Sequence, residues 1–252
     1  MPYRIDFHVP SDDVLDRLAD LGALDGHVTD QGMVAALMPD SISPEQVAVA
    51  LGVSHLSTSP VKGRDADSVW VLQPRPLRIR ERNLKLIDAA VFGTGLHPTT
   101  ALCLALLDQI ATIAVPDAML DVGTGSGVLA LAALMLGMPR VVGVDIDPAA
   151  LKVAAENARV NGLGDRLELV RGGPDSVRDS FPLVMANVLA APLIEMAPEL
   201  VRRVGSRGQL VLSGIASSLE EEVSRSYSGL GMRRVEVRSR TGWSALVLQA
   251  SW

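Results

Sequence analysis

The sequence feature that most constrains the fold is a glycine-rich loop placed directly after an apolar segment. The apolar stretch Ala118–Val122 runs into Gly123-Thr124-Gly125-Ser126-Gly127, and a helix-like segment at residues 128–137 follows. A strand, a glycine turn and a helix in this order are the opening of a βαβ unit in a parallel sheet. The loop therefore predicts an α/β domain with a ligand site at the end of its first strand.

The rest of the chain after residue 97 continues this pattern. Helices are expected from Pro98 and near residues 128–137, 148–161, 191–203 and 217–230. Strands are expected at residues 118–122, 141–145, 167–170, 182–187, 209–213, 234–238 and 245–249. Such alternation predicts a doubly wound, mainly parallel sheet of seven strands with helices on both faces. No helix separates the last two strands, which is typical of class I methyltransferases, whereas a dinucleotide-binding fold would be expected to insert a crossover helix there.

The front of the chain has a different rhythm, and we expect residues 1–62 to form a separate small domain. Strand and helix patterns follow in the order β-α-β-β-α-β, which is the ferredoxin-like α+β arrangement. Its second helix is expected to begin at Ser43-Pro44-Glu45. Residues 63–90 are polar and basic, and we interpret them as a connecting arm with one or two edge strands. An RNA contact there is disfavoured because Trp70 is the only aromatic residue among the charges.

Composition excludes several classes of protein. The 252 residues carry a net charge of −6, which disfavours stable nucleic-acid binding and suits a basic protein substrate. The one cysteine, Cys103, lies in an apolar stretch and is interpreted as a small buried hydrophobe rather than a nucleophile. No signal peptide, membrane span or His/Cys cluster is found, so we expect a soluble cytoplasmic protein without a metal. The sequence does not indicate an oligomeric state, and a monomer is assumed.

The glycine loop also indicates a cofactor. Its spacing is G-x-G-x-G, without the later glycine that nicotinamide binders would have in place of Val128. Asp121 completes a D-x-G-x-G-x-G pattern, which is typical of S-adenosylmethionine sites. We expect Asp121 to receive the cofactor's α-amino group, while Gly123 and Gly125 allow close backbone approach. Asp145 ends the second strand and is expected to accept hydrogen bonds from the ribose, with Ile146 flanking the adenine. The rival carboxylate, Asp147, precedes Pro148 and is expected to cap the next helix.

Two further motifs point to one family. Residues 92–100 read Phe-Gly-Thr-Gly-Leu-His-Pro-Thr-Thr, and residues 186–190 read Ala-Asn-Val-Leu-Ala. From residue 91 onward the chain resembles the PrmA-type methyltransferases that modify ribosomal protein L11. The resemblance implies a methyltransferase domain at residues 91–252 and a substrate-recognition role for the front domain. It also implies that the cofactor is bound by Thr100, Gly123, Asp145 and Asn187. In the same family, the residues that correspond to Phe92 and Thr94 would line the loop over the cofactor.

Asn187 ends the fourth strand, where methyl acceptors usually enter such folds, and is the candidate for orienting the acceptor. The motif lacks the prolines and the aromatic ring of N-P-P-Y enzymes, which argues against a stacked planar amine and is compatible with the alkyl amine of lysine. We expect methyl transfer to lysine or α-amino groups of a ribosomal protein. Another protein, an RNA or a small amine remains the alternative acceptor. No general base is identified, since His97 is interpreted as a loop-positioning residue.

Overall fold

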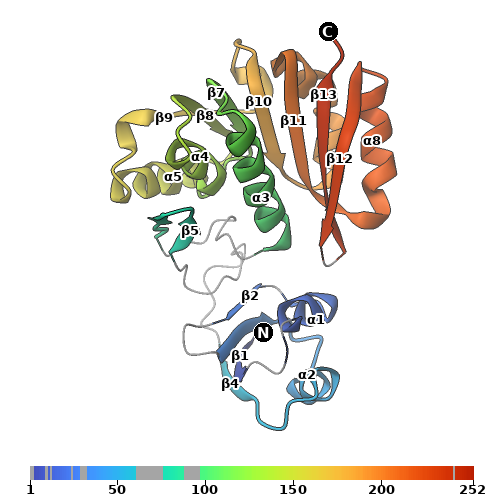
Figure 1. Cartoon of the computed structure of the whole chain (residues 1–252). Coiled ribbons are helices and arrows are strands. Elements are labelled where there is room, and N and C mark those ends of the chain that lie inside the picture. The colour runs from blue at the N-terminus through green and yellow to red at the C-terminus, as the bar shows by residue number, and fades with distance from the viewer. Residues whose placement is uncertain are drawn as a thin grey trace. The chain divides into compact units, whose positions relative to one another are not determined.

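The computed structural model describes residues 3–8, 11, 13–23, 25–28, 33–60, 76–87, 97–240 and 242–252. The chain divides into two compact units, Met1–Pro74 and Arg75–Trp252 (Figure 1). Among the described residues, no helix is long and apolar enough to cross a membrane.

The first unit is a small α+β structure, as the sequence pattern predicts. Its antiparallel sheet has the strand order β2-β3-β1-β4. This order agrees with a ferredoxin-like arrangement. Alternate residues of β1 and β3, among them Ile5, Phe7 and Val34, share one apolar cluster with residues of both helices. The elements are β1 (Tyr3–His8), α1 (Val14–Asp20), β2 (Asp25–Val28), β3 (Met33–Met38), α2 (Pro44–Leu51) and β4 (Ser57–Pro60).

The second unit is built on a seven-stranded sheet with the order β12-β13-β11-β10-β7-β8-β9. All neighbours are parallel except β13, which runs antiparallel to both β11 and β12. This is the class I methyltransferase sheet, with the predicted terminal hairpin. Its strands are β7 (Ala118–Val122), β8 (Arg140–Asp145), β9 (Leu167–Arg171), β10 (Phe181–Asn187), β11 (Val204–Ala216), β12 (Met232–Arg240) and β13 (Trp243–Ala250).

Helices cover both faces of this sheet because successive strand residues point to opposite sides. Met119 and Met185 belong to the cluster that includes residues of α3 and α4, whereas Leu120 and Val184 belong to the cluster with α6, α7 and α8. Cys103 on α3 is fully buried, which confirms its interpretation as a core residue, and burial raises the pKa of its thiol to about 12. The helices are α3 (Pro98–Ile113), α4 (Val128–Met135), α5 (Pro148–Val160), α6 (Ala190–Glu195), α7 (Ala197–Arg203) and α8 (Glu220–Ser228).

The prediction of a single helix at residues 191–203 is wrong, because the structure has two short helices there. α6 ends at Glu195 and α7 begins at Ala197, with Pro198 in its first turn. A proline has no backbone N–H and its ring collides with the carbonyl four residues earlier, so it begins a helix more readily than it continues one.

Part of the expected connecting arm belongs to the second unit. Strands β5 (Leu77–Ile79) and β6 (Arg82–Leu84) form a two-stranded hairpin of their own rather than edge strands of the main sheet. Ile79 and Leu84 are buried in the same cluster as α3 and α4. Arg80 takes a positive φ of 51° at the turn and pairs with Asp108 on α3 at 2.7 Å. The second unit therefore starts at Arg75, before the motif at residues 92–100.

Replacing Leu84 tests whether this hairpin is part of the core. Leu84→Ala removes a fully buried side chain and is expected to lower the free energy of unfolding by about 2–4 kcal/mol in urea titrations. The matched control Leu230→Ala, at a position 37% exposed, is expected to cost less than about 1 kcal/mol. Equal, small effects of both substitutions would show that the hairpin adds little to the fold.

Candidate functional site

Three functional side chains stand at neighbouring strand ends on one edge of the sheet. In the register, Val122 of β7 lies level with Val144 of β8 and Ala186 of β10. Asp145 and Asn187 therefore follow one residue beyond the same level, and Asp121 comes one residue before it. The carboxyl ends of parallel strands are where α/β folds bind their ligands.

The glycine loop is fixed to β8 by its backbone. The N–H groups of Gly123 and Thr124 both donate to the Val144 carbonyl, at 2.9 and 3.0 Å. The N–H of Gly125 donates to Asp145 Oδ2 at 2.9 Å, and the second carboxylate oxygen accepts the N–H of Asp147 at 3.0 Å. Asp145 thus holds the loop, and its carboxylate oxygens can accept further hydrogen bonds. Asp147 caps α5 by accepting the N–H of Ala149, as expected from the sequence.

Asp121 lies beneath the loop with an exposed fraction of 1%. Its Oδ2 accepts a hydrogen bond from the Thr124 hydroxyl at 2.7 Å. Burial raises the pKa of this carboxyl to about 6, partly offset by the bonds from Thr124 and the backbone of Ala130, and nearby Asp145 raises it further. A carboxylate in such a place binds a cation more strongly than one in water does. Thr124 was missed from the sequence, although its place three residues after the acid is a usable signal.

Asn187 presents a buried oxygen with no partner in the described structure. Its Nδ2 donates to the Thr100 hydroxyl at 3.3 Å, while Oδ1 is buried and unpaired. Thr100, in the first turn of α3, is fully buried. Buried amide oxygens are nearly always hydrogen-bonded, so an unpaired one marks a place where a ligand's N–H or O–H would be received.

Val188, the residue after Asn187, lies between two glycines, with its side chain against Gly123 and its backbone against Gly214. A Cβ on Gly123 would lie 2.6 Å from Val188 Cγ1, and one on Gly214 would lie 2.3 Å from the Val188 carbonyl oxygen. Both glycines also have positive φ, 70° and 85°. Gly214 was missed from the sequence because its closeness to Val188 is a tertiary contact. These approaches bring the ends of β7, β10 and β11 together.

His97 forms the N-cap of α3, which carries Thr99 and Thr100. The Thr99 N–H donates to Nδ1 of the ring at 3.4 Å, and the Thr99 hydroxyl lies 2.8 Å from the same nitrogen. Burial lowers the pKa of His97, which favours a neutral ring with Nδ1 as acceptor. The Thr99 carbonyl in turn accepts the Ser213 hydroxyl at 3.3 Å, which ties α3 to β11.

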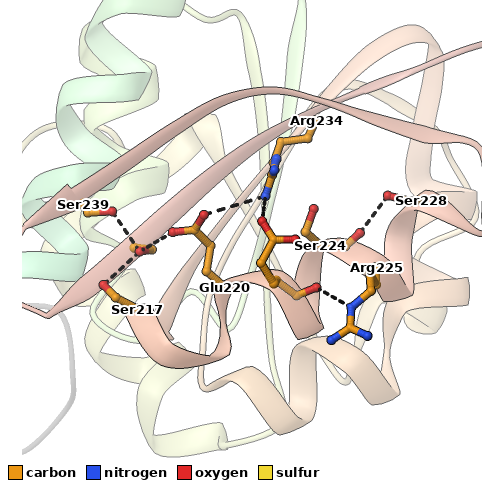
Figure 2. A network of polar contacts seen from close by, with 9 residues as sticks. Ser217, Glu220, Ser224, Arg225, Ser228, Arg234 and Ser239 are labelled. Atoms are coloured by element: carbon orange, nitrogen blue, oxygen red, sulfur yellow. Dashed lines mark hydrogen bonds and ion pairs between the residues drawn. The ribbon is translucent and has the colours of Figure 1, made fainter.

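The terminal hairpin reaches this edge through Trp243. The indole packs edge-on against His97, with ring centroids 5.1 Å apart. A polar network holds the hairpin: Ser244 contacts Ser217 and Ser239, each at 3.0 Å, and donates to Glu220 at 2.9 Å (Figure 2). Trp243 was missed because the sequence places it in a turn, whereas it is the first residue of β13.

The remaining expected residues divide into exposed and undescribed ones. Ile146 directly follows β8, and its side chain is 76% exposed. Phe92 and Thr94 lie outside the described residues. Among the described residues, no group of His, Cys, Asp or Glu side chains is arranged to hold a metal ion.

Comparison with known proteins identifies the family. A family model described as ribosomal protein L11 methyltransferase (PrmA) matches residues 59–251. This chain belongs to that family. It is 38% identical over 217 residues to the ribosomal protein L11 methyltransferase of Pelobacter propionicus, an alignment that covers 78% of this chain and 70% of the relative. It is 44% identical over 164 residues to that of Geobacter sulfurreducens, covering 65% of this chain and 53% of the relative.

A solved structure agrees with this assignment. The ribosomal protein L11 methylase from Lactobacillus delbrueckii subsp. bulgaricus superposes with a TM-score of 0.62 at 28% identity, covering 67% of this chain and 86% of that one. The cofactor of an L11 methyltransferase is S-adenosylmethionine, and the residues present fit it. The buried Asp121 carboxylate is suited to a cationic group, and the unpaired Asn187 oxygen is suited to an N–H or O–H donor.

The raised pKa of Asp121 predicts how cofactor binding depends on pH. The cofactor's ammonium group requires the ionised carboxylate, so the dissociation constant of S-adenosylhomocysteine is expected to rise about tenfold per pH unit as the pH falls below 6. Calorimetry at pH 5 in two buffers of different ionisation enthalpy is expected to show release of about one proton on binding. Asp121→Asn is the control, with weak and pH-independent binding. A dissociation constant that does not change with pH in the wild type would show that Asp121 only holds Thr124 and does not bind the cofactor.

Proposed function

We propose that this protein transfers methyl groups from S-adenosylmethionine to lysine or α-amino groups of ribosomal protein L11. The observation that carries the proposal is the buried, unpaired Asn187 oxygen at the sheet edge, beside the glycine loop. The names of its relatives support the choice of acceptor. Ribosome assembly takes place in the cytoplasm, which supports that location for the enzyme.

The site residues named above are proposed to divide between cofactor and acceptor. Asp121 and the glycine loop would hold the amino-acid end, and Asp145 with Ile146 would hold the nucleoside. Thr100 would orient the Asn187 amide, since its hydroxyl accepts the Nδ2 hydrogen. Phe92 and Thr94 are assigned to the same site by the resemblance of residues 92–100. Asn187 Oδ1 would accept an N–H of the incoming amine and direct its lone pair.

The bound cofactor supplies an electrophilic methyl group on a sulfonium. The amine would take this methyl group, S-adenosylhomocysteine would leave as the neutral thioether, and the product amine would lose its extra proton to solvent. A lysine must first be neutral, which costs about 4 kcal/mol at pH 7.5. His97 is not placed to take that proton through Nδ1, because this nitrogen faces Thr99. Positioning of the amine is therefore the main contribution of the protein.

The charge of the front unit supports a basic partner. Residues 1–74 carry eleven Asp and Glu but four Lys and Arg, whereas residues 75–252 carry eighteen and nineteen. The acidic character of the chain is thus concentrated in the unit that the family resemblance assigns to substrate recognition. Opposite charge accelerates association and orients the partner.

Methyl transfer to L11 is tested with labelled S-adenosylmethionine and hypomethylated ribosomes. We expect label in ribosomal protein L11, and expect Asn187→Ala to lower kcat/KM by about 100-fold or more while the protein stays folded. Label found only in RNA or small molecules would contradict the proposed acceptor. Label found only in another protein would keep the chemistry and reject L11.

The role of the acidic front unit is tested by reversing charges at two exposed positions of the α1 region. Asp13→Lys combined with Asp20→Lys is expected to raise the KM for L11 about fivefold, with kcat unchanged. The control, Asp165→Lys combined with Glu222→Lys, makes the same change of net charge at exposed positions of the second unit. Equal effects of the two pairs would show that only the overall charge matters.

A further inference from the structure

Asn157 on α5 contacts two parts of the second unit that are far apart in sequence. Asn157 has no exposed surface. Its Nδ2 donates to the Ser126 carbonyl in the glycine loop at 2.8 Å. Its Oδ1 accepts the backbone N–H of Ile87 at 2.7 Å. One amide group thus spans from the cofactor loop to the segment that follows the β5–β6 hairpin.

The contact with Ser126 fixes a peptide that the helix cannot fix. Ser126 precedes Gly127, the N-cap of α4, so its peptide lies before the first helical turn. The next N–H, that of Gly127, donates to the Thr124 carbonyl at 2.8 Å. With Asn157 on the carbonyl and Thr124 on the N–H, both polar ends of this peptide are held. The orientation of the loop residues around Gly125 depends on that peptide.

The contact with Ile87 is one of three hydrogen bonds by which α5 and its C-cap residue hold the backbone of residues 85–87. Asn161, one turn further along the chain, accepts the N–H of Lys85 at 2.9 Å and donates to its carbonyl at 2.6 Å. The two asparagines together replace a strand partner for residues 85–87. Asn161 thus contacts the same segment as Asn157 but at a different residue, and it also donates to the Asn157 carbonyl at 2.7 Å; among the described contacts it has none to the glycine loop.

We infer that Asn157 is a positioning residue for the cofactor site. It holds the Ser126 peptide against Lys85–Ile87, the segment from which the sequence runs on into the motif at residues 92–100. Cofactor binding to the glycine loop then stabilises the bond at Ile87, because both bonds share one rigid amide. This inference rests on the proposed function, since it concerns the same cofactor.

The test compares the same substitution at two positions of one helix. Asn157→Asp retains an acceptor for Ile87 and replaces the donor to Ser126 by an oxygen, and Asn157→Ala removes both contacts. Asn161→Asp is the matched control, because it changes the Lys85 contact and leaves Ser126 alone. Melting temperatures establish that each variant is folded. The readouts are KM for S-adenosylmethionine, kcat, and hydrogen exchange at the Ile87 amide with and without S-adenosylhomocysteine.

The expected result separates positioning from stability. Both Asn157 variants are expected to raise KM for S-adenosylmethionine about tenfold or more with a smaller change in kcat, and to lose the slowing of exchange at Ile87 that the ligand causes in the wild type. Asn161→Asp is expected to change KM by less than about twofold, even where its melting temperature falls as far. Retained slowing in Asn157→Ala, or equal KM changes at both positions, overturns the inference. Failure of the wild type to bind S-adenosylhomocysteine in calorimetry would instead reject the proposed function.

Discussion

The close passage of Val188 between Gly123 and Gly214 is the constraint on which the catalytic unit depends. Any side chain at either glycine would meet Val188 at 2.6 Å or less. The passage keeps the carboxyl ends of β7, β10 and β11 together, and β8 joins them through the bonds from Gly123 and Thr124 to the Val144 carbonyl. The parallel register brings Asp121, Asp145 and Asn187 to a common edge, and the two glycines leave room for Val188 beside them.

The site contains a buried carboxyl, that of Asp121, whose ionised form is unfavourable without a cation beside it. Asp121 is buried and has a pKa near 6, so the ionised form is destabilised until a cation arrives. In the ligand-free protein the contribution of this carboxyl to stability is fully present below its ordinary pKa of 3.8 and is lost as the pH rises through about 6. A bound ammonium group offsets that loss. Likewise, the unpaired oxygen of Asn187 is unfavourable alone and favourable with a donor.

The sequence was most informative where function depends on local spacing. The glycine loop, the strand-end acids and the Asp147 cap are all encoded within a few residues, and the alternation of strands and helices predicted the seven-stranded sheet. The sequence predicted one or two strands in residues 63–90, but not their pairing as the β5–β6 hairpin, because each strand has three residues and several of these are charged. Its two buried residues, Ile79 and Leu84, have meaning only against α3 and α4.

Contacts between distant residues explain what could not be predicted. Asn157 looks like an ordinary polar residue of an amphipathic helix until Ile87 and Ser126 are placed beside it. Trp243 looks like a turn residue until His97 meets its ring. Val188 contacts both Gly123 and Gly214, which are ninety-one residues apart in the sequence. No local pattern carries such information.

We propose that the carboxyl edge of β7, β8 and β10 holds the cofactor. The most direct test is an amide NMR titration of the full-length, isotope-labelled protein with S-adenosylhomocysteine. We expect the largest shifts at the backbone amides of Gly123 and Gly125 and at the side-chain amide of Asn187. Shifts concentrated instead in the first unit or along β12, with these three amides unchanged, would contradict it.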